Sequence, residues 1–306
     1  MEVKEKIKML QEKMKEERID YYLIPTADYH NSEYVNDYFK VREYFSGFTG
    51  SNGTLLVSRT EAGLWTDGRY FIQAEKELSG SGITLFRMQE EGVPTIPEYL
   101  AQHMQEKEAL GFDGRVVTAS YGKKLEKALQ DKNVVFCYEK DLAGSLWTDR
   151  PEMPGNPVSV LPEEICGLSA AQKLAQVREK MKEQNCTAHL LAKLDDLMWL
   201  LNIRGKDVAY NPVALSYGFF TMTDAWLFIQ ERAVSDELRE YALKYGITLK
   251  KYDEITTFLK TVTAERVLFD EDNVSYALYR ILREKTELSL DANPTEKLKA
   301  VKNPVE

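Results

Sequence analysis

The sequence predicts an α/β protein of two tandem, duplicated domains, each a mixed β-sheet flanked by helices. Three observations point there: an internal repeat, a hairpin within alternating helices and strands, and a proline-rich break near the middle of the 306 residues. A chain of this length also exceeds the usual size of a single domain, so length alone favours two.

The repeat consists of three pairs of similar segments that occur in the same order. EKMKE at Glu12 returns at Glu179, SGITLFRM returns as YGITLKKY, and GFDGRVVTASYGKKLEKAL returns more weakly as LFDEDNVSYALYRIL. The spacing between matched residues shrinks from 167 (Glu12 to Glu179) to 155 (Ser120 to Ser275). Duplication of one domain, followed by small deletions, explains this order.

Each copy is expected to contain the same elements in the same order. It opens with an amphipathic helix, apolar at Ile7, Met9, Leu10 and Met14 in the first copy, and continues into an apolar strand, YYLI or AHLLA. A polar helical segment and a glycine-bearing loop follow, SGFTGSNG or NIRGKD. The hairpin comes next, TLLVSRTEAGLWT or GFFTMTDAWLFI, before further alternation of helix and strand.

The predicted boundary lies in TDRPEMPGNPV at 148–158. It contains three prolines and a glycine, which neither a helix nor a central strand accommodates. The two α/β domains are therefore placed at 1–153 and 158–293.

Composition excludes several classes of function. The net charge of −9 disfavours nucleic acid as a partner, and no apolar run approaches the length of a membrane span. The charged N-terminal helix lacks the apolar core of an export signal, so a cytoplasmic protein is expected. Its three cysteines, Cys137, Cys166 and Cys186, are odd in number and widely spaced, which predicts reduced, semi-buried thiols.

The three histidines are assigned structural roles. His103 is placed in a helix over 99–110 as a solvated or half-buried side chain, and His189 in the strand TAHLLA as a core residue. The loop TADYHNSEY around His30 is either a binding edge or a helix cap made by Asp28 or Asn31, and capping is favoured.

Other polar motifs carry little chemistry. The sequence contains no H-E-x-x-H, G-x-S-x-G or phosphate-loop motif. The glycines of SGFTGSNG precede a strand, whereas a phosphate cradle precedes a helix, so they predict a tight loop. Asp195 and Asp196 are expected in the first turn of a helix, pointing apart, so that they cannot chelate one ion together. RGKDVAYNP, at 204–212, is expected to be a surface loop.

GLWTDGRYF at 63–71 has two interpretations that spacing alone does not separate. In the structural one, Trp65 packs in a hairpin strand and Asp-Gly turns the chain into a helix near Arg69. In the functional one, the Arg69 guanidinium leaves a rigid strand end and donates two hydrogen bonds to a carboxylate or carbonyl of a ligand.

Six long and irregular motifs carry a family resemblance: IPTADYHNSEY, YFSGFTGSNGTLLV, GLWTDGRYF, LWTDRPEMP, WLLNIRGKDVAYNP and KAVKNPVE. In this order they resemble the N-terminal portion of the long, three-domain Xaa-Pro aminopeptidases (aminopeptidase P), relatives of prolidase and creatinase. The resemblance covers essentially the whole chain. It implies two creatinase-type N-terminal domains, with 294–306 as the start of the first helix of a catalytic pita-bread domain.

The resemblance also implies a reaction and its participants. In this family the catalytic domain holds two divalent ions, usually manganese, through two Asp, one His and two Glu, and releases the residue that precedes proline at the peptide N-terminus. None of those ligand motifs occurs here, so this chain is expected to contain no catalytic residue, metal ligand or cofactor, and to be inactive alone. The implied partners are Xaa-Pro peptides, the catalytic domain and a second copy of the chain.

Residue roles carry over only where the motif matches. Arg69 is the implied substrate-binding residue, and Asp67 and Tyr70 are implied to support its loop. Tyr210 stands where relatives can have a histidine, so no role passes to it.

Two alternatives remain open. The first is a non-catalytic binding or regulatory protein built from creatinase-type domains, against which the end of the sequence within an expected helix argues. The second is a fragment of another pita-bread hydrolase, such as prolidase or a creatinase-like enzyme. The duplication argues against it, because those relatives carry one N-terminal domain.

Overall fold

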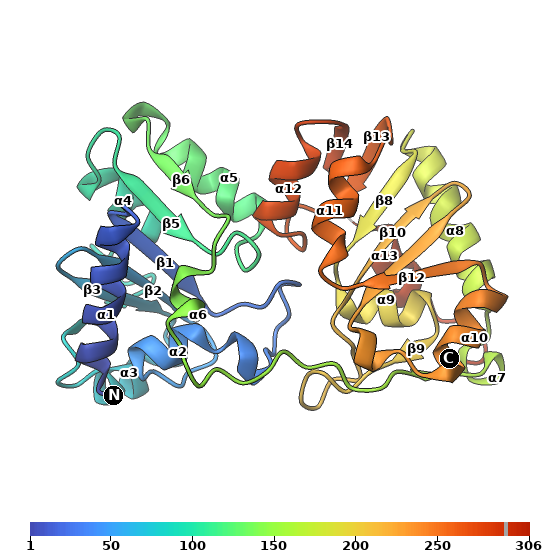
Figure 1. The fold of residues 1–306 in the computed structure, drawn as a ribbon, viewed down its shortest axis with the longest axis horizontal. Helices are drawn as coiled ribbons and strands as arrows, with labels where there is room; N and C mark the ends of the chain where they lie inside the picture. Colours follow the sequence, from blue (N-terminus) through green and yellow to red (C-terminus); the bar gives the residue numbers. More distant parts are fainter. Residues whose placement is uncertain (291–292) are drawn as a thin grey trace. The chain divides into compact units, whose positions relative to one another are not determined.

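The computed structural model describes residues 1–290 and 293–306 and divides into two compact units (Figure 1). Unit 1 comprises Met1–Asp28 and Asp37–Glu152, and unit 2 comprises Tyr29–Asn36 and Met153–Glu306. The segment Tyr29–Asn36, which the sequence places within the first domain, therefore groups with unit 2.

Unit 1 contains a six-stranded sheet and the helices around it. In chain order its elements are α1 (Val3–Glu16), β1 (Tyr21–Pro25), η1 (Asp37–Phe39), α2 (Val41–Ser46), β2 (Thr54–Ser58), β3 (Ala62–Thr66), α3 (Phe71–Glu77), β4 (Ile83–Arg87), α4 (Ile96–His103), β5 (Ala109–Phe112), α5 (Ala119–Ala128), η2 (Gln130–Lys132), β6 (Val135–Cys137) and α6 (Leu142–Ser145).

Unit 2 contains a second six-stranded sheet and a separate two-stranded one. Its elements are β7 (Ser159–Val160), α7 (Glu163–Cys166), α8 (Ala170–Glu183), β8 (Ala188–Leu191), α9 (Leu194–Leu200), β9 (Ile203–Arg204), β10 (Ser216–Thr221), β11 (Ala225–Ile229), η3 (Glu231–Ala233), α10 (Asp236–Lys244), β12 (Ile247–Lys251), α11 (Glu254–Thr261), β13 (Arg266–Phe269), α12 (Tyr276–Leu282), β14 (Glu287–Leu290) and α13 (Pro294–Ala300).

The two large sheets share one topology. Their strand orders are β4-β3-β2-β1-β5-β6 and β12-β11-β10-β8-β13-β14. In each sheet β2 or β10 runs antiparallel to both neighbours, and the other neighbouring pairs are parallel. Five strands of each sheet therefore end at the same edge, called here the carboxyl edge. The shared order and directions confirm the predicted duplication and the mixed sheets.

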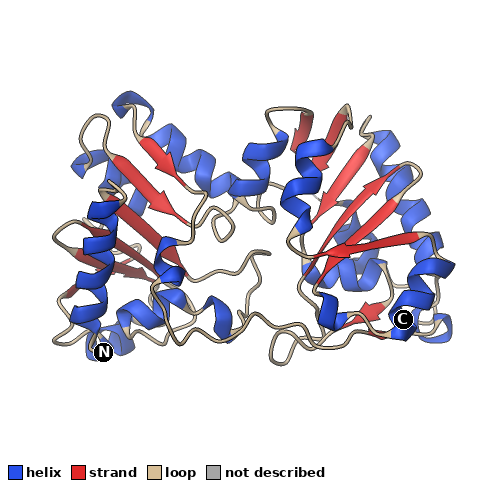
Figure 2. Cartoon of the chain, in the orientation of Figure 1, coloured by secondary structure: helices blue, strands red, loops and turns tan. Residues whose placement is uncertain are grey.

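Helices cover both faces of each sheet (Figure 2). In unit 1, the amphipathic helix α1 buries Ile7, Leu10 and Met14 in one core, together with Phe45 of α2 and Leu55 of β2. The spacing of the α1 residues places them on one stripe of the helix, and burying that stripe stabilises the unit.

One helix boundary and one repeat alignment differ from the sequence-based expectation. α4 ends at His103, not near residue 110, because Ala109–Phe112 is a strand that pairs with β1. The third repeat match also shifts, because Ser275 corresponds to Thr118 and not to Ser120. Thr118 and Ser275 are the N-cap residues of α5 and α12.

Gly82 and Gly246 occupy equivalent positions immediately before β4 and β12, with φ of +81° and +65°. A Cβ at Gly82 would have Lys4 Cε as its nearest neighbour at 4.0 Å, and one at Gly246 would have nothing within 4 Å. Alanine at either site should therefore lower the free energy of unfolding by about 1 kcal/mol through the backbone conformation alone. Denaturant unfolding of the two variants measures this, and a cost confined to one site would contradict their equivalence.

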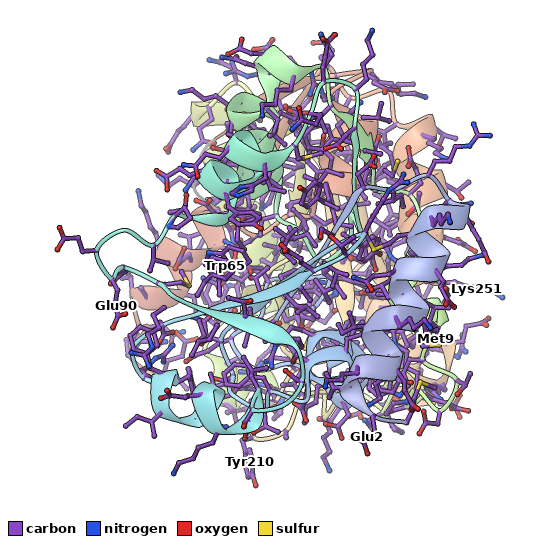
Figure 3. All side chains as sticks on the ribbon, turned by 90° about the vertical axis from the view of Figure 1, so that its left-hand side faces the viewer. Glu2, Met9, Trp65, Glu90, Tyr210 and Lys251 are labelled. Atoms are coloured by element: carbon purple, nitrogen blue, oxygen red, sulfur yellow. The ribbon has the colours of Figure 1, made fainter. Side chains whose placement is uncertain are left out.

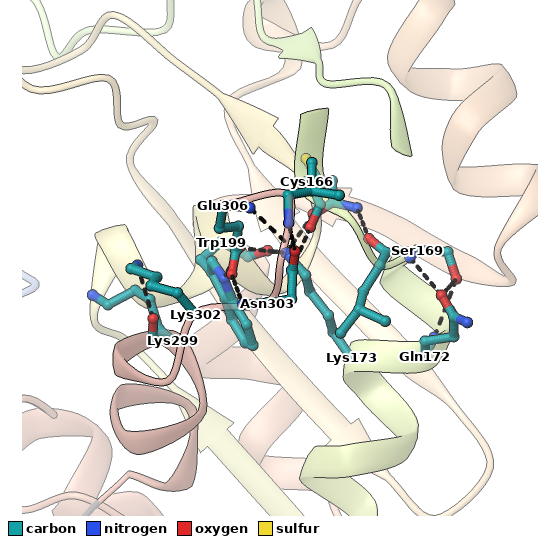
Figure 4. A network of polar contacts seen from close by, with 12 residues as sticks. Cys166, Ser169, Gln172, Lys173, Trp199, Lys299, Lys302, Asn303 and Glu306 are labelled. Atoms are coloured by element: carbon teal, nitrogen blue, oxygen red, sulfur yellow. Dashed lines mark hydrogen bonds and ion pairs between the residues drawn. The ribbon is translucent and has the colours of Figure 1, made fainter. Parts of the chain in front are cut away.

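The last residues of the chain pack on unit 2. α13 contacts α8 and α9, and Lys299 of α13 reaches the buried Asp196 of α9, with Nζ to Oδ1 at 2.6 Å. Beyond it, Trp199 Nε1 donates to Glu306 Oε1 at 2.9 Å and Asn303 Nδ2 donates to the Cys166 carbonyl at 3.0 Å (Figure 4). Assignment of 294–306 to a further domain stays a prediction.

Candidate functional site

The candidate site is a pair of loops at the carboxyl edge of unit 1. Thr54, the first residue of β2, lies opposite Trp65 near the end of β3. This register brings the glycine-rich loop that precedes β2 (residues 47–53) beside the loop that follows β3 (residues 67–70). Trp65 is buried and stacks on Phe86, with ring centroids 3.9 Å apart, so the strand that carries the second loop is fixed in the core.

The loops are joined by side-chain hydrogen bonds. Asn52 Nδ2 donates to Asp67 Oδ2 at 2.6 Å, and the Ser51 and Tyr70 hydroxyls are 2.6 Å apart. A Cβ on Gly50 would lie 2.2 Å from the Phe48 ring and 2.8 Å from the Tyr70 ring. The glycine-rich segment is therefore a tight loop, as predicted, in which only glycine fits at position 50.

Arg42 holds the glycine-rich loop in place through hydrogen bonds to its backbone, a role that the sequence analysis missed. Its side chain is buried and donates Nη1 and Nη2 to the carbonyls of Phe48 and Gly50, and Nε to Thr26 Oγ1 at 2.9 Å. Burial lowers the pKa of Arg42 to about 10. The signal in the sequence was its place on the buried stripe of VREYFS, three residues before Phe45.

Arg69 and Asp67 form a fork within the second loop. Asp67 Oδ1 accepts from the Arg69 backbone N at 3.0 Å and from Nε at 2.9 Å, and Oδ2 accepts from Nη2 at 2.8 Å. The side-chain hydrogen bond from Arg69 is the main cause that holds the pKa of the Asp67 carboxyl well below its usual range. The Arg69 side chain is 68% exposed, so its guanidinium is both oriented and accessible.

The same fork occurs a second time in unit 1, after β5. Asp113 Oδ1 accepts from the Arg115 backbone N at 3.0 Å and from Nε at 2.9 Å, and Oδ2 accepts from Nη2 at 2.9 Å. Both sites read Asp-Gly-Arg, so this tripeptide makes the fork by itself. The fork is thus no evidence of function, and what distinguishes Arg69 is its greater exposure, 68% against 44%, and its place beside the glycine-rich loop.

Other residues from the sequence analysis have structural places. His189 is buried in β8 and His103 is exposed, as expected, and Cys137, Cys166 and Cys186 are free thiols. The capping role suggested around His30 is wrong. No helix begins at this loop, and His30 is buried, with Nε2 2.7 Å from the Tyr252 hydroxyl.

Asp195 and Asp196 lie in the first turn of α9, as predicted, and the sequence analysis missed their partner Lys299, which contacts both carboxylates. The Lys299 ammonium belongs to α13, and both carboxylates belong to the first turn of α9.

The described residues do not fit a dinuclear metal centre. Over 1–290 and 293–306, no three His, Cys, Asp or Glu side chains form a group that could hold a metal ion. Within these ranges no helix has both the length and the apolar character needed to cross a membrane.

Two models of the creatinase/prolidase N-terminal domain match the chain, one at residues 6–140 and one at residues 149–306. The chain belongs to the creatinase/prolidase N-terminal domain family. Each match covers one of the duplicated sheets, which confirms the resemblance drawn from the motifs.

Similar proteins of this family include Xaa-Pro aminopeptidases. Xaa-Pro aminopeptidase app-1 of Caenorhabditis elegans is 35% identical over 92% of this chain and 47% of its own length, and Aminopeptidase P1 of Arabidopsis thaliana is 33% identical over 94% and 48%. The solved X-prolyl aminopeptidase of C. elegans, described as a cytosolic enzyme with a di-nuclear active site, has 32% identity and a TM-score of 0.92 over 100% of this chain and 52% of that one. The chain thus spans about half the length of these relatives.

Proposed function

We propose that this chain is the N-terminal, non-catalytic region of a metallo-aminopeptidase that removes the N-terminal residue from peptides with proline in the second position. Three findings support this proposal. Both family models match the chain, a solved X-prolyl aminopeptidase matches both units, and the chain covers about half the length of aminopeptidases similar to it. In this proposal the chain shapes the substrate cleft, and a catalytic domain supplies the two divalent ions, for which the family resemblance implies manganese. The proposal places the protein in the cytoplasm and includes a second copy of the chain as a partner.

The observation that carries a direct role in substrate binding is the geometry of Arg69. Asp67 and the loop contacts through Asn52 hold the base of the side chain, while most of its surface is exposed. A planar guanidinium that is oriented before binding loses less entropy when it hydrogen-bonds a peptide carbonyl or carboxylate. In the proposal Arg69 binds the peptide, and Asp67 and Tyr70 position it.

In the full-length aminopeptidase, Arg69→Ala should lower kcat/KM for an Arg-Pro-Pro peptide by about tenfold or more, since a charge-assisted hydrogen bond contributes about 1.5–3 kcal/mol. The free energy of unfolding should change by no more than about 1 kcal/mol, because the side chain is exposed. Steady-state kinetics and denaturant unfolding of the same preparation measure both quantities.

Arg115→Ala is the matched control, because it removes the arginine of an identical fork in the same unit. It should leave kcat/KM within about twofold, and Arg69→Lys should recover part of the loss, since an ammonium lacks the planar fork. Equal losses in the two alanine variants would assign the effect to the Asp-Gly-Arg turn and remove Arg69 from the substrate site.

The 306-residue chain alone should hydrolyse no Xaa-Pro peptide and retain no manganese after dialysis, because its described carboxylates and histidines form no ligand group. Metal analysis and a peptidase assay on the purified chain provide the measurement. Stoichiometric metal, or turnover that survives repurification, would overturn the assignment of a non-catalytic region.

A further inference from the structure

A pocket of about 420 Å³ opens at the carboxyl edge of the unit 2 sheet. Four separate stretches of chain line it: residues 30–34, the turn between β8 and α9 (193–195), the loop before β10 (208–213), and Asn273 beyond β13. Ligands of open α/β sheets bind at this edge, where parallel strands end.

The first wall is the segment Tyr29–Asn36, which is fastened to unit 2. His30 is buried, with Nδ1 2.9 Å from the Ala192 carbonyl and its ring 4.4 Å from that of Tyr217, centroid to centroid. Asn36 Nδ2 donates to the Asp207 carbonyl at 2.8 Å. These contacts give the pocket a fixed wall, although the segment contains no helix or strand.

The facing wall is the loop before β10, which is equally well anchored. The buried Asp207 carboxylate accepts from the backbone N of Asn156 at 2.8 Å and of Leu215 at 2.9 Å. The tip of this loop carries Tyr210 at φ +62°, fully exposed and projecting outward (Figure 3), directly before the pocket residue Asn211. A tyrosine in the left-handed region is strained, and such strain concentrates at functional sites.

The duplicated domain shows that the fold does not require a cavity of this size. The corresponding cavity of unit 1, at the ends of β1 and β5, measures about 20 Å³, and Phe39 and Arg150 are among the side chains around it. The cavity at this sheet edge is therefore much smaller in unit 1 than in unit 2.

We propose that the unit 2 pocket binds a short, extended peptide segment that carries a basic side chain. Asn31, Asn211 and Asn273 line the pocket, and a carboxamide offers both N–H donors and an oxygen acceptor, which matches the alternating groups of a peptide backbone. Asn31 Nδ2 donates to the Asp272 carbonyl at 2.9 Å and Asn273 Nδ2 to Asp270 Oδ2 at 2.7 Å, so two of the carboxamides are oriented before a ligand arrives.

The charges in the lining set the preference for a basic residue. Lys193 pairs with Glu296 at 3.0 Å, and Asp195 pairs with Lys299. Glu33 is exposed in the wall and forms no ion pair within the part of the chain that the structure describes. A cationic ligand group could pair with the Glu33 carboxylate without breaking an existing ion pair. Leu194 and Val213 provide apolar surface in the same pocket.

The test is a titration of the isotopically labelled 306-residue chain with capped tetrapeptides Ac-Ala-Xaa-Ala-Ala-NH₂, in which Xaa is Lys, Gln or Glu. The Lys peptide should shift the side-chain amide NMR signals of Asn31, Asn211 and Asn273 and bind about tenfold more tightly than the Glu peptide. Glu33→Gln should reduce that ratio to about twofold or less. Glu240→Gln, an equal charge change on the exposed face of α10, should leave it unaltered.

Three results would overturn the proposal: no amide shift with any peptide at millimolar concentration, a Lys preference that persists in Glu33→Gln, or an equal loss in Glu240→Gln. Since the titration involves no catalysis and does not use Arg69, its outcome is separate from that of the proposed function.

Discussion

Replacement of Arg42 by alanine is expected to lower the free energy of unfolding of unit 1 by about 3 kcal/mol. The guanidinium is buried and serves three acceptors: the carbonyls of Phe48 and Gly50 and the hydroxyl of Thr26. Removing it leaves two buried carbonyls without a donor, at about 1–3 kcal/mol each, and opens a cavity under the loop. Part of this cost is offset because a buried charge, which makes no ion pair among the described residues, also disappears.

Denaturant unfolding, followed by the fluorescence of the unit 1 tryptophans, measures this loss. Arg42→Lys should recover little of it, since one ammonium cannot reach two carbonyls and a hydroxyl with the geometry of the planar group. The control is Arg59→Ala, because Arg59 is 45% exposed and pairs with Asp20 at 2.8 Å on the surface of the same unit. Its cost should stay within about 1 kcal/mol, and an equal cost for both variants would refute the role assigned to Arg42.

The loss of Arg42 also has a functional consequence, because the loop that it holds supports the Arg69 fork. Ser51 and Asn52 of that loop contact Tyr70 and Asp67. In the full-length enzyme, Arg42→Ala should therefore raise KM more than it lowers kcat, at a temperature where the variant is still folded.

Much of the fold was available from the sequence because its signals are local. The repeat EKMKE, the glycines before β4 and β12, and the hairpin patterns each report on one helix, turn or strand pair, and the two sheets have the common topology that these matches predicted. The tight loop at Gly50 could also be predicted, since glycine density reflects a local backbone requirement.

The features that escaped prediction depend on contacts between residues distant in sequence. His30 reaches residues 192 and 252, and Lys299 reaches Asp195 and Asp196. Nothing in TADYHNSEY or LDDLMW indicates such a partner. Local propensity favours a helix cap near His30, which tertiary contacts override, whereas the first-turn acids of α9 form as predicted and gain a distant partner in addition. The Asp-Gly-Arg fork is a different case. Its geometry is local and could be predicted from the tripeptide, but whether its arginine binds a ligand depends on residues outside the loop.

Acidification should destabilise unit 2 through His189. This side chain is buried in β8, with Nδ1 3.2 Å from the Leu268 carbonyl of β13, and burial is the main cause that lowers its pKa from 6.5 to about 4. Between these values the unfolded chain binds a proton that the folded chain does not. The folded state therefore loses stability as the pH falls from 6.5 toward 4, by about 3 kcal/mol in total, and loses no more below that range.

Carboxylates in the same unit act in the opposite direction. Burial raises the pKa of Asp196 and of Asp270, so the folded state binds their protons more readily than the unfolded state, and stability rises as they are protonated. The contribution of His189 is consequently read from the difference between two pH profiles of the unfolding free energy, one for the unaltered chain and one for His189→Gln.

The His189→Gln profile should lack the loss of about 3 kcal/mol between pH 6.5 and 4, whatever its stability at pH 7.5, because glutamine has no proton to bind in this range. His103→Gln is the control, since His103 is exposed at the end of α4 in unit 1 and its replacement leaves the buried histidine in place. Its profile should follow that of the unaltered chain. Parallel profiles for the unaltered chain and His189→Gln would mean that His189 is protonated in the folded state as readily as in the unfolded one, and that its burial in β8 has no electrostatic cost.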